Sequence, residues 1–236
     1  MRPDWPPDPE RTTDTMSNWD IIWSVRDIFW QGFLNTLAIF ALSTVLAALI
    51  GMATGLALEL GARPINRLLR LFIDGLRMLP FLMLAYLLYY GLPSAGIRLN
   101  AWWAGVGALA VYHGAYVAEI LRGARANLAP GQIEAATALG LSPYRTYLRL
   151  ILPQLLIRSR PLMGNQLIIA LKDTAFLIII TVQELTAAAN TVQATYFIPM
   201  DAFVVVIALY WLISIGLEIT IRGLGIFGRK RGFDNG

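Results

Sequence analysis

The chain has 236 residues, of which 57% are hydrophobic and 14% charged, with a mean hydropathy of +0.59; these values exclude a soluble globular domain and indicate a polytopic membrane protein. It contains no cysteine and one histidine, His113, so disulfide frames, thiolate metal sites and His-rich metal sites are excluded too. The net charge of +4 is unevenly spread along the chain, and we use its distribution to predict topology.

The N-terminal segment 1–28 is expected to lie outside the membrane body. Its first fifteen residues contain four Pro, four acids and two Arg, a composition typical of disorder. They lack the basic region and apolar run of a cleavable signal peptide. Met16 is an alternative start site. Three tryptophans follow at the spacing of an interfacial aromatic anchor: Trp19, Trp23 and Trp30.

Five apolar segments follow, each long enough to cross a hydrocarbon core of about 30 Å. The predicted spans are Phe29–Leu60, Leu68–Tyr90, Trp102–Leu121, Pro161–Thr181 and Ala202–Leu224. They predict an all-α integral membrane domain over residues 29–228, followed by a basic tail, 229–236. Thirteen Lys and Arg fall in the first and third connections and at the C-terminus, against four on the other side. The positive-inside rule therefore predicts an external N-terminus and a cytoplasmic C-terminus.

Ionisable residues within the spans are costly and form two groups. The first group consists of acid and Arg pairs near the cytoplasmic ends, spaced three or four residues apart, which favours structural ion pairs. These pairs are Asp74 with Arg77, Glu119 with Arg122, and Glu218 with Arg222.

The second group lies near the predicted midplane. His113 is nine residues from Arg122, and Lys172 is twelve from Arg160, which places both roughly 14 to 18 Å deep at 1.5 Å per residue. Donors, acceptors and charges of this kind suit a polar solute. The candidate pathway residues are His113, Tyr116, Gln166, Lys172 and Asp173, with Tyr112 lining them. The alternative, that Lys172 and Asp173 neutralise each other within the bundle, stays open.

The connection between the third and fourth predicted spans has its own fold signal. Gln132–Leu139 is rich in helix formers, Gly140 can take a left-handed conformation that ends a helix, and Ser142-Pro143 suits the start of the next helix. The first helix, roughly 13 Å long, is too short to cross a membrane. Its small side chains and the charged Glu134 suit a cleft on another protein.

This connection, Glu134-Ala135-Ala136, then Gly140, then Leu150–Pro153, resembles the EAA loop of import-type ABC transporter permeases. Ala115–Gly123, Gly164–Gln166 and Leu171–Thr174 are similar to the polar amino-acid branch, of histidine and glutamine type. The resemblance implies that the coupling loop, 131–153, docks into a cytoplasmic ATPase subunit. The residues implied in coupling are Glu134, Ala135, Ala136, Gly140 and Pro153.

The resemblance also implies a multi-pass subunit of the bacterial inner membrane that forms half of an amino-acid import pathway. Its implied partners are a second permease chain, two ATPase subunits and an external solute-binding protein, with no nucleic acid. Which solute is carried, and whether the two permease chains are identical, stays open. An ion-coupled secondary transporter or channel is the alternative function.

Motifs for catalysis are absent from the sequence. Neither of the two lysines, Lys172 and Lys230, belongs to a phosphate-binding P-loop, so ATP and Mg are expected in a partner subunit and no cofactor in this chain. There is no zinc-protease or serine-hydrolase motif either. Gly223–Gly228 matches the letters of a dinucleotide fingerprint, but it follows a membrane helix where that motif requires a strand. The sequence therefore predicts a transport subunit that is not an enzyme.

Overall fold

The computed structural model describes residues 17–230, with side chains described to residue 223, and this part of the chain is helical throughout with short connections. The predicted disorder of Met1–Thr15 and the tail beyond residue 230 lie outside the described residues. Four helical segments are long and apolar enough to cross a membrane: Arg26–Leu60, Ala101–Ala126, Arg160–Ile180 and Pro199–Gly223. A bent pair of helical segments, Arg63–Met78 with Phe81–Ala95, makes a fifth crossing if the pair is one broken span, and the predicted all-α membrane fold is confirmed.

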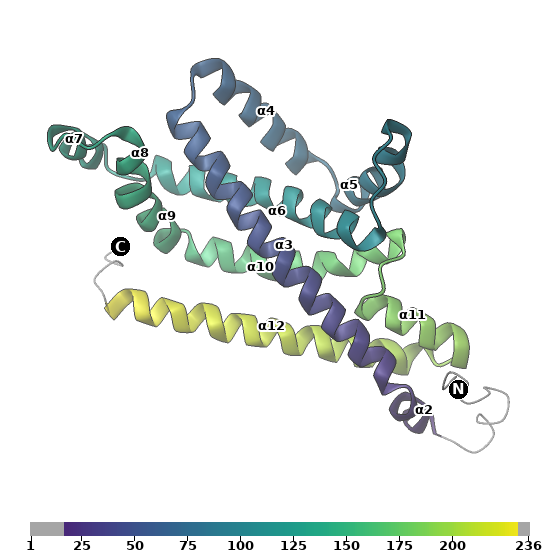
Figure 1. Cartoon of the computed structure of the whole chain (residues 1–236). Coiled ribbons are helices and arrows are strands. Elements are labelled where there is room, and N and C mark those ends of the chain that lie inside the picture. The colour runs from purple at the N-terminus through teal and green to yellow at the C-terminus, as the bar shows by residue number, and fades with distance from the viewer. Residues whose placement is uncertain (1–16, 231–236) are drawn as a thin grey trace, which may run out of the picture.

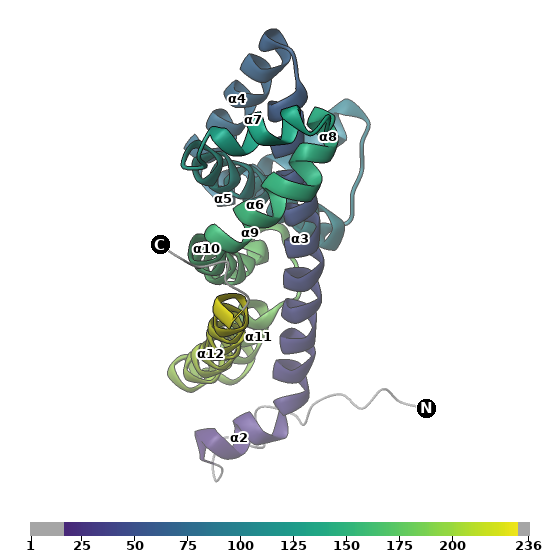
Figure 2. The same cartoon turned by 90° about the vertical axis from the view of Figure 1, so that its left-hand side faces the viewer.

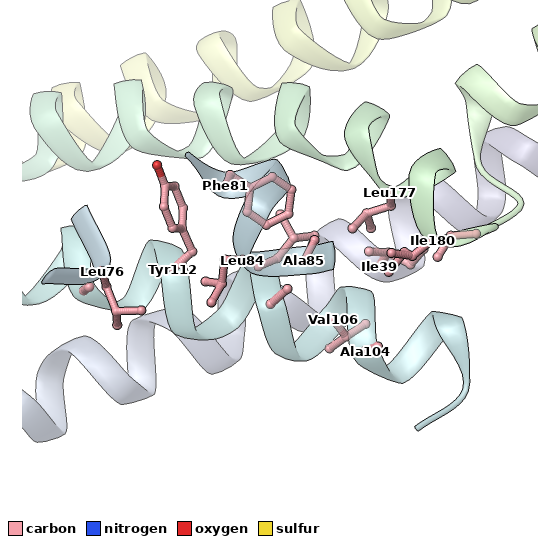
Figure 3. Packing of buried hydrophobic residues seen from close by; sticks show 14 of the residues in the cluster. Ile39, Leu76, Phe81, Leu84, Ala85, Ala104, Val106, Tyr112, Leu177 and Ile180 are labelled. Carbon is pink, nitrogen blue, oxygen red and sulfur yellow. The ribbon is translucent and has the colours of Figure 1, made fainter. Parts of the chain in front are cut away.

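The long helices are α3 (Arg26–Leu60), α6 (Ala101–Ala126), α10 (Arg160–Asp173) and α12 (Pro199–Lys230). With α4 (Arg63–Met78), helices α6, α10 and α12 form a row, and α3 crosses one side of that row (Figure 2). The 3₁₀ turn η4 (Thr174–Ile180) extends α10. Apolar side chains from α3, α4, α5, α6 and η4 fill the core between these helices (Figure 3).

The second predicted span is not one straight helix. Helix α4 ends at Met78, α5 (Phe81–Tyr86) begins after Pro80, and the two helical segments are bent by 105°. Proline lacks an N–H for the helix and disfavours a helical conformation in the residue before it. Leu79 accordingly has a ψ of 142°. The predicted span Leu68–Tyr90 therefore consists of two helical segments, and the pocket described below lies at the break between them.

The two ends of the bundle differ. One end carries the turn from α3 to α4 together with the short helices α7 (Gly131–Ala138) and α8 (Pro143–Thr146) (Figure 1). The opposite end carries α2 (Asn18–Ser24) and α11 (Leu185–Tyr196) (Figure 1). The short helices α7 and α8 therefore project from one end of the bundle, while α2 and α11 cover the other.

Candidate solute pocket and coupling segment

The segment 131–153 has the helix–turn–helix form that its sequence predicts. Gly140 has a φ of +74°, in the left-handed region that favours glycine. Its N–H donates to the Thr137 carbonyl at 2.9 Å, and the Leu141 N–H donates to the Ala136 carbonyl at 3.0 Å. These two bonds make a Schellman motif, which ends α7. The Ser142 hydroxyl then accepts from the Arg145 N–H and caps α8, with Pro143 at its first position.

Most of the residues predicted to couple are on the surface of this segment. Glu134, Ala135, Gly140 and Pro153 are exposed, and Leu139, at the C-terminal end of α7, is 81% exposed. Ala136 is buried, so it packs against the protein's own interior while its neighbours face outward. The outward face combines small side chains, one carboxylate and one large apolar side chain.

The coupling segment is fastened to the bundle by contacts that its sequence does not predict. The Gln154 amide donates to the Gln132 side-chain oxygen at 2.9 Å and ties α9 (Leu152–Arg158) to α7. Tyr147 is buried against α3, where a Cβ on Gly55 would lie 2.7 Å from its hydroxyl. Burial raises the pKa of the Tyr147 phenol. A displacement of α7 would therefore be transmitted to α3 through α9 and Tyr147.

The pocket is a cavity of about 320 Å³ at the break between α4 and α5, a size typical of small-molecule sites. Its walls come from the start of α5, from α6, from α10 and from η4. The lining residues are Pro80, Phe81, Leu82, Tyr112, Tyr116, Gln166, Ile169, Asp173 and Phe176. Phe81 lies beside Tyr112, and the Tyr112 ring extends from α6 toward α10 (Figure 3).

The structure brings four of the five predicted pathway residues together and leaves out the fifth. Tyr116, Gln166 and Asp173 line the cavity. His113 lies behind them: its Nδ1 is 2.8 Å from the Gln166 amide nitrogen, and its Nε2 is 3.3 Å from Asp173 Oδ2. Lys172 is exposed and does not line the cavity. A role for Lys172 in the pathway remains a prediction without support from this arrangement.

The helix break is stabilised by two tyrosine hydroxyls from α6. Tyr112 donates to the Leu79 carbonyl at 3.2 Å, and Tyr116 donates to the Arg77 carbonyl at 3.3 Å. Both carbonyls belong to the turn where the helical hydrogen-bond ladder is interrupted. Within a membrane such groups must be satisfied by protein. Tyr112 and Tyr116 therefore serve the pocket twice, as part of its wall and as supports for the bend.

An ion-pair network lies next to the pocket on the side of α4. The predicted pair Glu119 and Arg122 is confirmed, with oxygen–nitrogen distances of 2.6 and 2.7 Å. Arg77 is shared between Asp74, at 3.7 Å, and Glu119, at 3.4 Å. The Arg77 guanidinium also stacks over the Tyr116 ring, 5.4 Å from its centre.

Two further ion pairs lie away from the pocket. The predicted Glu218 and Arg222 pair is confirmed, whereas the bond between Glu59 of α3 and Arg125 of α6 joins residues 66 apart, and sequence spacing does not predict it.

A bundle of membrane-length helices with a pocket at a helix break and an exposed segment at one end is the arrangement expected of a membrane-transport subunit. Residues 47–224 match the family described as binding-protein-dependent transport system inner membrane component. The chain belongs to this family. It is a multi-pass ABC transporter permease of the cytoplasmic membrane and not an enzyme, since the ATPase of such a transporter is a separate subunit.

Individual relatives are permease proteins of amino-acid transport systems or related systems, as the family match predicts. The glutamine transport system permease protein GlnP of Escherichia coli (strain K12) is 34% identical over 209 residues, which cover 88% of this chain and 95% of the relative. The octopine transport system permease protein OccM of Rhizobium meliloti is 32% identical over 197 residues, covering 77% of this chain and 80% of the relative.

A solved structure, the crystal structure of an amino acid ABC transporter with histidines, contains a chain with 28% identity and a TM-score of 0.79, covering 89% of this chain and 98% of that one. The MetNI methionine ABC transporter, at 20% identity and a TM-score of 0.66, shares the fold.

Proposed function

We propose that this permease imports polar amino acids. The observation that carries the proposal is the cavity at the α4–α5 break, where a carboxylate, an amide and two phenols from two different helices face one small volume: Asp173, Gln166, Tyr112 and Tyr116. An amino acid offers an ammonium donor and a carboxylate acceptor, which such groups can bind. Relatives that carry glutamine and octopine in their names, and the solved amino acid transporter, support the same solute class.

The chain provides half of the pathway in this proposal. A second permease chain, identical or related, completes it; two ATPase subunits bind ATP and Mg on the cytoplasmic side; and a solute-binding protein delivers the amino acid from outside. The exposed face of α7, with Glu134, Ala135 and Leu139, is the contact with the ATPase. Support comes from its protrusion beyond the bundle (Figure 1) and from the hydrogen bond between Gln154 and Gln132 that fastens it to α9.

Sidedness follows from charge. Arg63, Arg67, Arg145 and Arg149 belong to the end of the bundle that carries α7 and α8, and an excess of Arg favours the cytoplasmic side. A reporter inserted after Gly236 or within 131–149 should be cytoplasmic, and one inserted between Glu184 and Asp201 should be external. Opposite locations for either pair would reject the proposed orientation.

The decisive test is reconstitution. The permease, the ATPase and the binding protein of the same system are placed in liposomes, and uptake of labelled L-glutamine, L-arginine, L-histidine and L-glutamate is measured with and without internal or external ATP. We expect accumulation of at least one amino acid that requires ATP at the α7 side and is unaffected by ionophores. Uptake by the permease alone under an ion gradient would show the secondary transporter instead and would reject the proposal.

A further inference from the structure

One buried side chain, His113, lies behind the residues that line the pocket and contacts two of them. The His113 side chain is 4% exposed and lies between α6 and α10. Its two ring nitrogens face two pocket residues: Nδ1 faces the Gln166 amide nitrogen at 2.8 Å, and Nε2 faces Asp173 Oδ2 at 3.3 Å. An amide nitrogen only donates, so Nδ1 accepts, and the proton of a neutral imidazole is then on Nε2, toward Asp173.

The contact between His113 Nε2 and the Asp173 carboxylate leaves most of the hydrogen-bond acceptor positions of that carboxylate unused. Nε2 is buried and makes no well-aligned hydrogen bond, although the carboxylate oxygen is within 3.3 Å. The Asp173 side chain is 15% exposed, and that exposed part lines the cavity. A carboxylate has about four lone-pair directions. Asp173 therefore keeps acceptor capacity for a group inside the cavity.

The cavity is suited to a cation. Asp173 is the one charged residue among those that line it, and four of the lining residues are aromatic: Phe81, Tyr112, Tyr116 and Phe176. The faces of aromatic rings attract cations, and a carboxylate in such surroundings is weakly screened. Arg77 stacks over the Tyr116 ring, does not line the cavity and is already shared by Asp74 and Glu119. No lining cation therefore competes for Asp173.

We infer that Asp173 binds the ammonium group of the solute, and that His113 is the positioning residue that orients this carboxylate and the neighbouring Gln166 amide. This inference rests on the proposed function and names the part of the solute that the half-pocket recognises. Without the imidazole, the Gln166 amide loses the ring nitrogen that it contacts at 2.8 Å, and the Asp173 carboxylate loses the ring nitrogen that lies 3.3 Å from its Oδ2. A buried polar group without a partner reorients or costs stability, so the solute would meet a misplaced acceptor.

The first experiment needs no solute. Because His113 is the only histidine in the chain, ¹⁵N-histidine labelling of a permease purified through a histidine-free tag gives the signals of this ring alone. At pH 7.5 we expect Nε2 protonated and Nδ1 bare. Gln166→Leu should shift the Nδ1 signal, and Asp173→Asn the Nε2 signal. A ring protonated on both nitrogens, or on Nδ1 only, would overturn the inference, since the first neutralises Asp173 and the second removes its donor.

The second experiment measures binding to the permease–ATPase complex without the binding protein, so that only the pocket selects. The probes are L-glutamine, L-arginine, L-histidine and L-glutamate, and the tightest of them is compared with its analogue lacking the α-amino group. We expect the analogue and the Asp173→Asn variant each to bind at least a hundredfold more weakly, the loss of a buried charge-assisted contact. Asp201→Asn, the same chemical change in a residue that accepts from Asn18 of α2 and does not line the cavity, should bind as wild type does.

The positioning role separates from a structural one in uptake kinetics. His113→Leu should raise KM for the same amino acid about tenfold while kcat stays within about twofold, and His113→Gln, which keeps a donor that can reach Asp173, should recover most of the loss. Equal binding of the desamino analogue, or His113→Leu with unchanged KM, would overturn the inference. If these binding results hold but no amino acid accumulates with ATP, the proposed function fails instead.

Discussion

The coupling segment and the solute pocket are built on different principles. The segment takes its shape from bonds between residues three to five apart around Gly140, whereas the pocket takes its shape from residues between Pro80 and Phe176 on several elements. Local hydrogen bonds survive changes in helix packing, and a pocket of this kind does not. In a transporter the first can move as a rigid unit, and the second can open and close as helices shift.

The largest effect is expected where the rigid unit is broken. In Gly140→Val a β-branched residue must adopt a φ of +74°, at a cost of roughly 1 to 2 kcal/mol or more. The turn would therefore rearrange and reorient α7. We expect normal insertion but a loss of more than tenfold in solute-stimulated ATP hydrolysis, measured in proteoliposomes. Gly131→Ala, in the same segment but in open space, is the matched control, and wild-type hydrolysis in both variants would refute a rigid coupling turn.

A smaller loss is expected from a charge reversal that leaves the turn intact. Glu134 is exposed on α7, so Glu134→Lys should fold normally and weaken only the contact with the ATPase. Co-purification of the ATPase should fall severalfold at 0.15 M salt and change with ionic strength, because the affected interaction is between surface charges. Thr137→Lys, also exposed on the same helix, tests whether position matters. Equal effects of the two variants would indicate nonspecific charge repulsion.

The pocket side of the comparison can be tested through the helix break. Tyr112→Phe and Tyr116→Phe remove the hydroxyls that donate to the Leu79 and Arg77 carbonyls. Each change should destabilise the protein by about 1 kcal/mol, and up to 3 kcal/mol if the carbonyl finds no other donor. Thermal unfolding in detergent measures this, with the exposed Tyr144 changed to Phe as control. Unchanged unfolding temperatures would mean that the bend does not depend on α6.

The smallest effect is expected at Glu184, which makes both local hydrogen bonds, as in the coupling segment, and a contact between distant helices, as in the pocket. Glu184 caps α11 by accepting from the Thr186 and Ala187 N–H groups, yet it is fully buried and also accepts from Tyr210 of α12. Burial raises the pKa of its carboxyl group, against the opposing effect of those hydrogen bonds.

The folded state therefore binds the Glu184 proton more tightly than the unfolded state does. The stability that this proton supplies is fully present below the unfolded pKa, about 4.3, and is lost as pH rises through the folded pKa. Glu184→Gln should accordingly be more destabilising at pH 5 than at pH 8, measured by thermal unfolding of both proteins across that range. The reverse trend would mean that the hydrogen bonds outweigh burial.

Much of the architecture is readable from local sequence. Hydropathy locates the spans because each must present about 20 apolar residues to lipid. Gly140, Ser142 and Pro143 predict the coupling turn because left-handed backbone, helix capping and a fixed φ are properties of single residues. The pair Glu119 and Arg122 follows from helical spacing, and it is present at 2.6 Å.

The sequence by itself therefore determined the fold class, the positions of the long apolar helices and the form of the coupling segment, since these depend on composition and on neighbours along one helix. Only the tertiary structure decided that the second span breaks by 105° at Pro80, because a proline in a membrane helix can kink or end it, depending on which groups satisfy the freed carbonyls. It also decided that Asp173 lines the pocket while Lys172, the adjacent residue, is exposed. Successive helical residues point about 100° apart, at 3.6 residues per turn, and packing against α6 selects which of them faces inward.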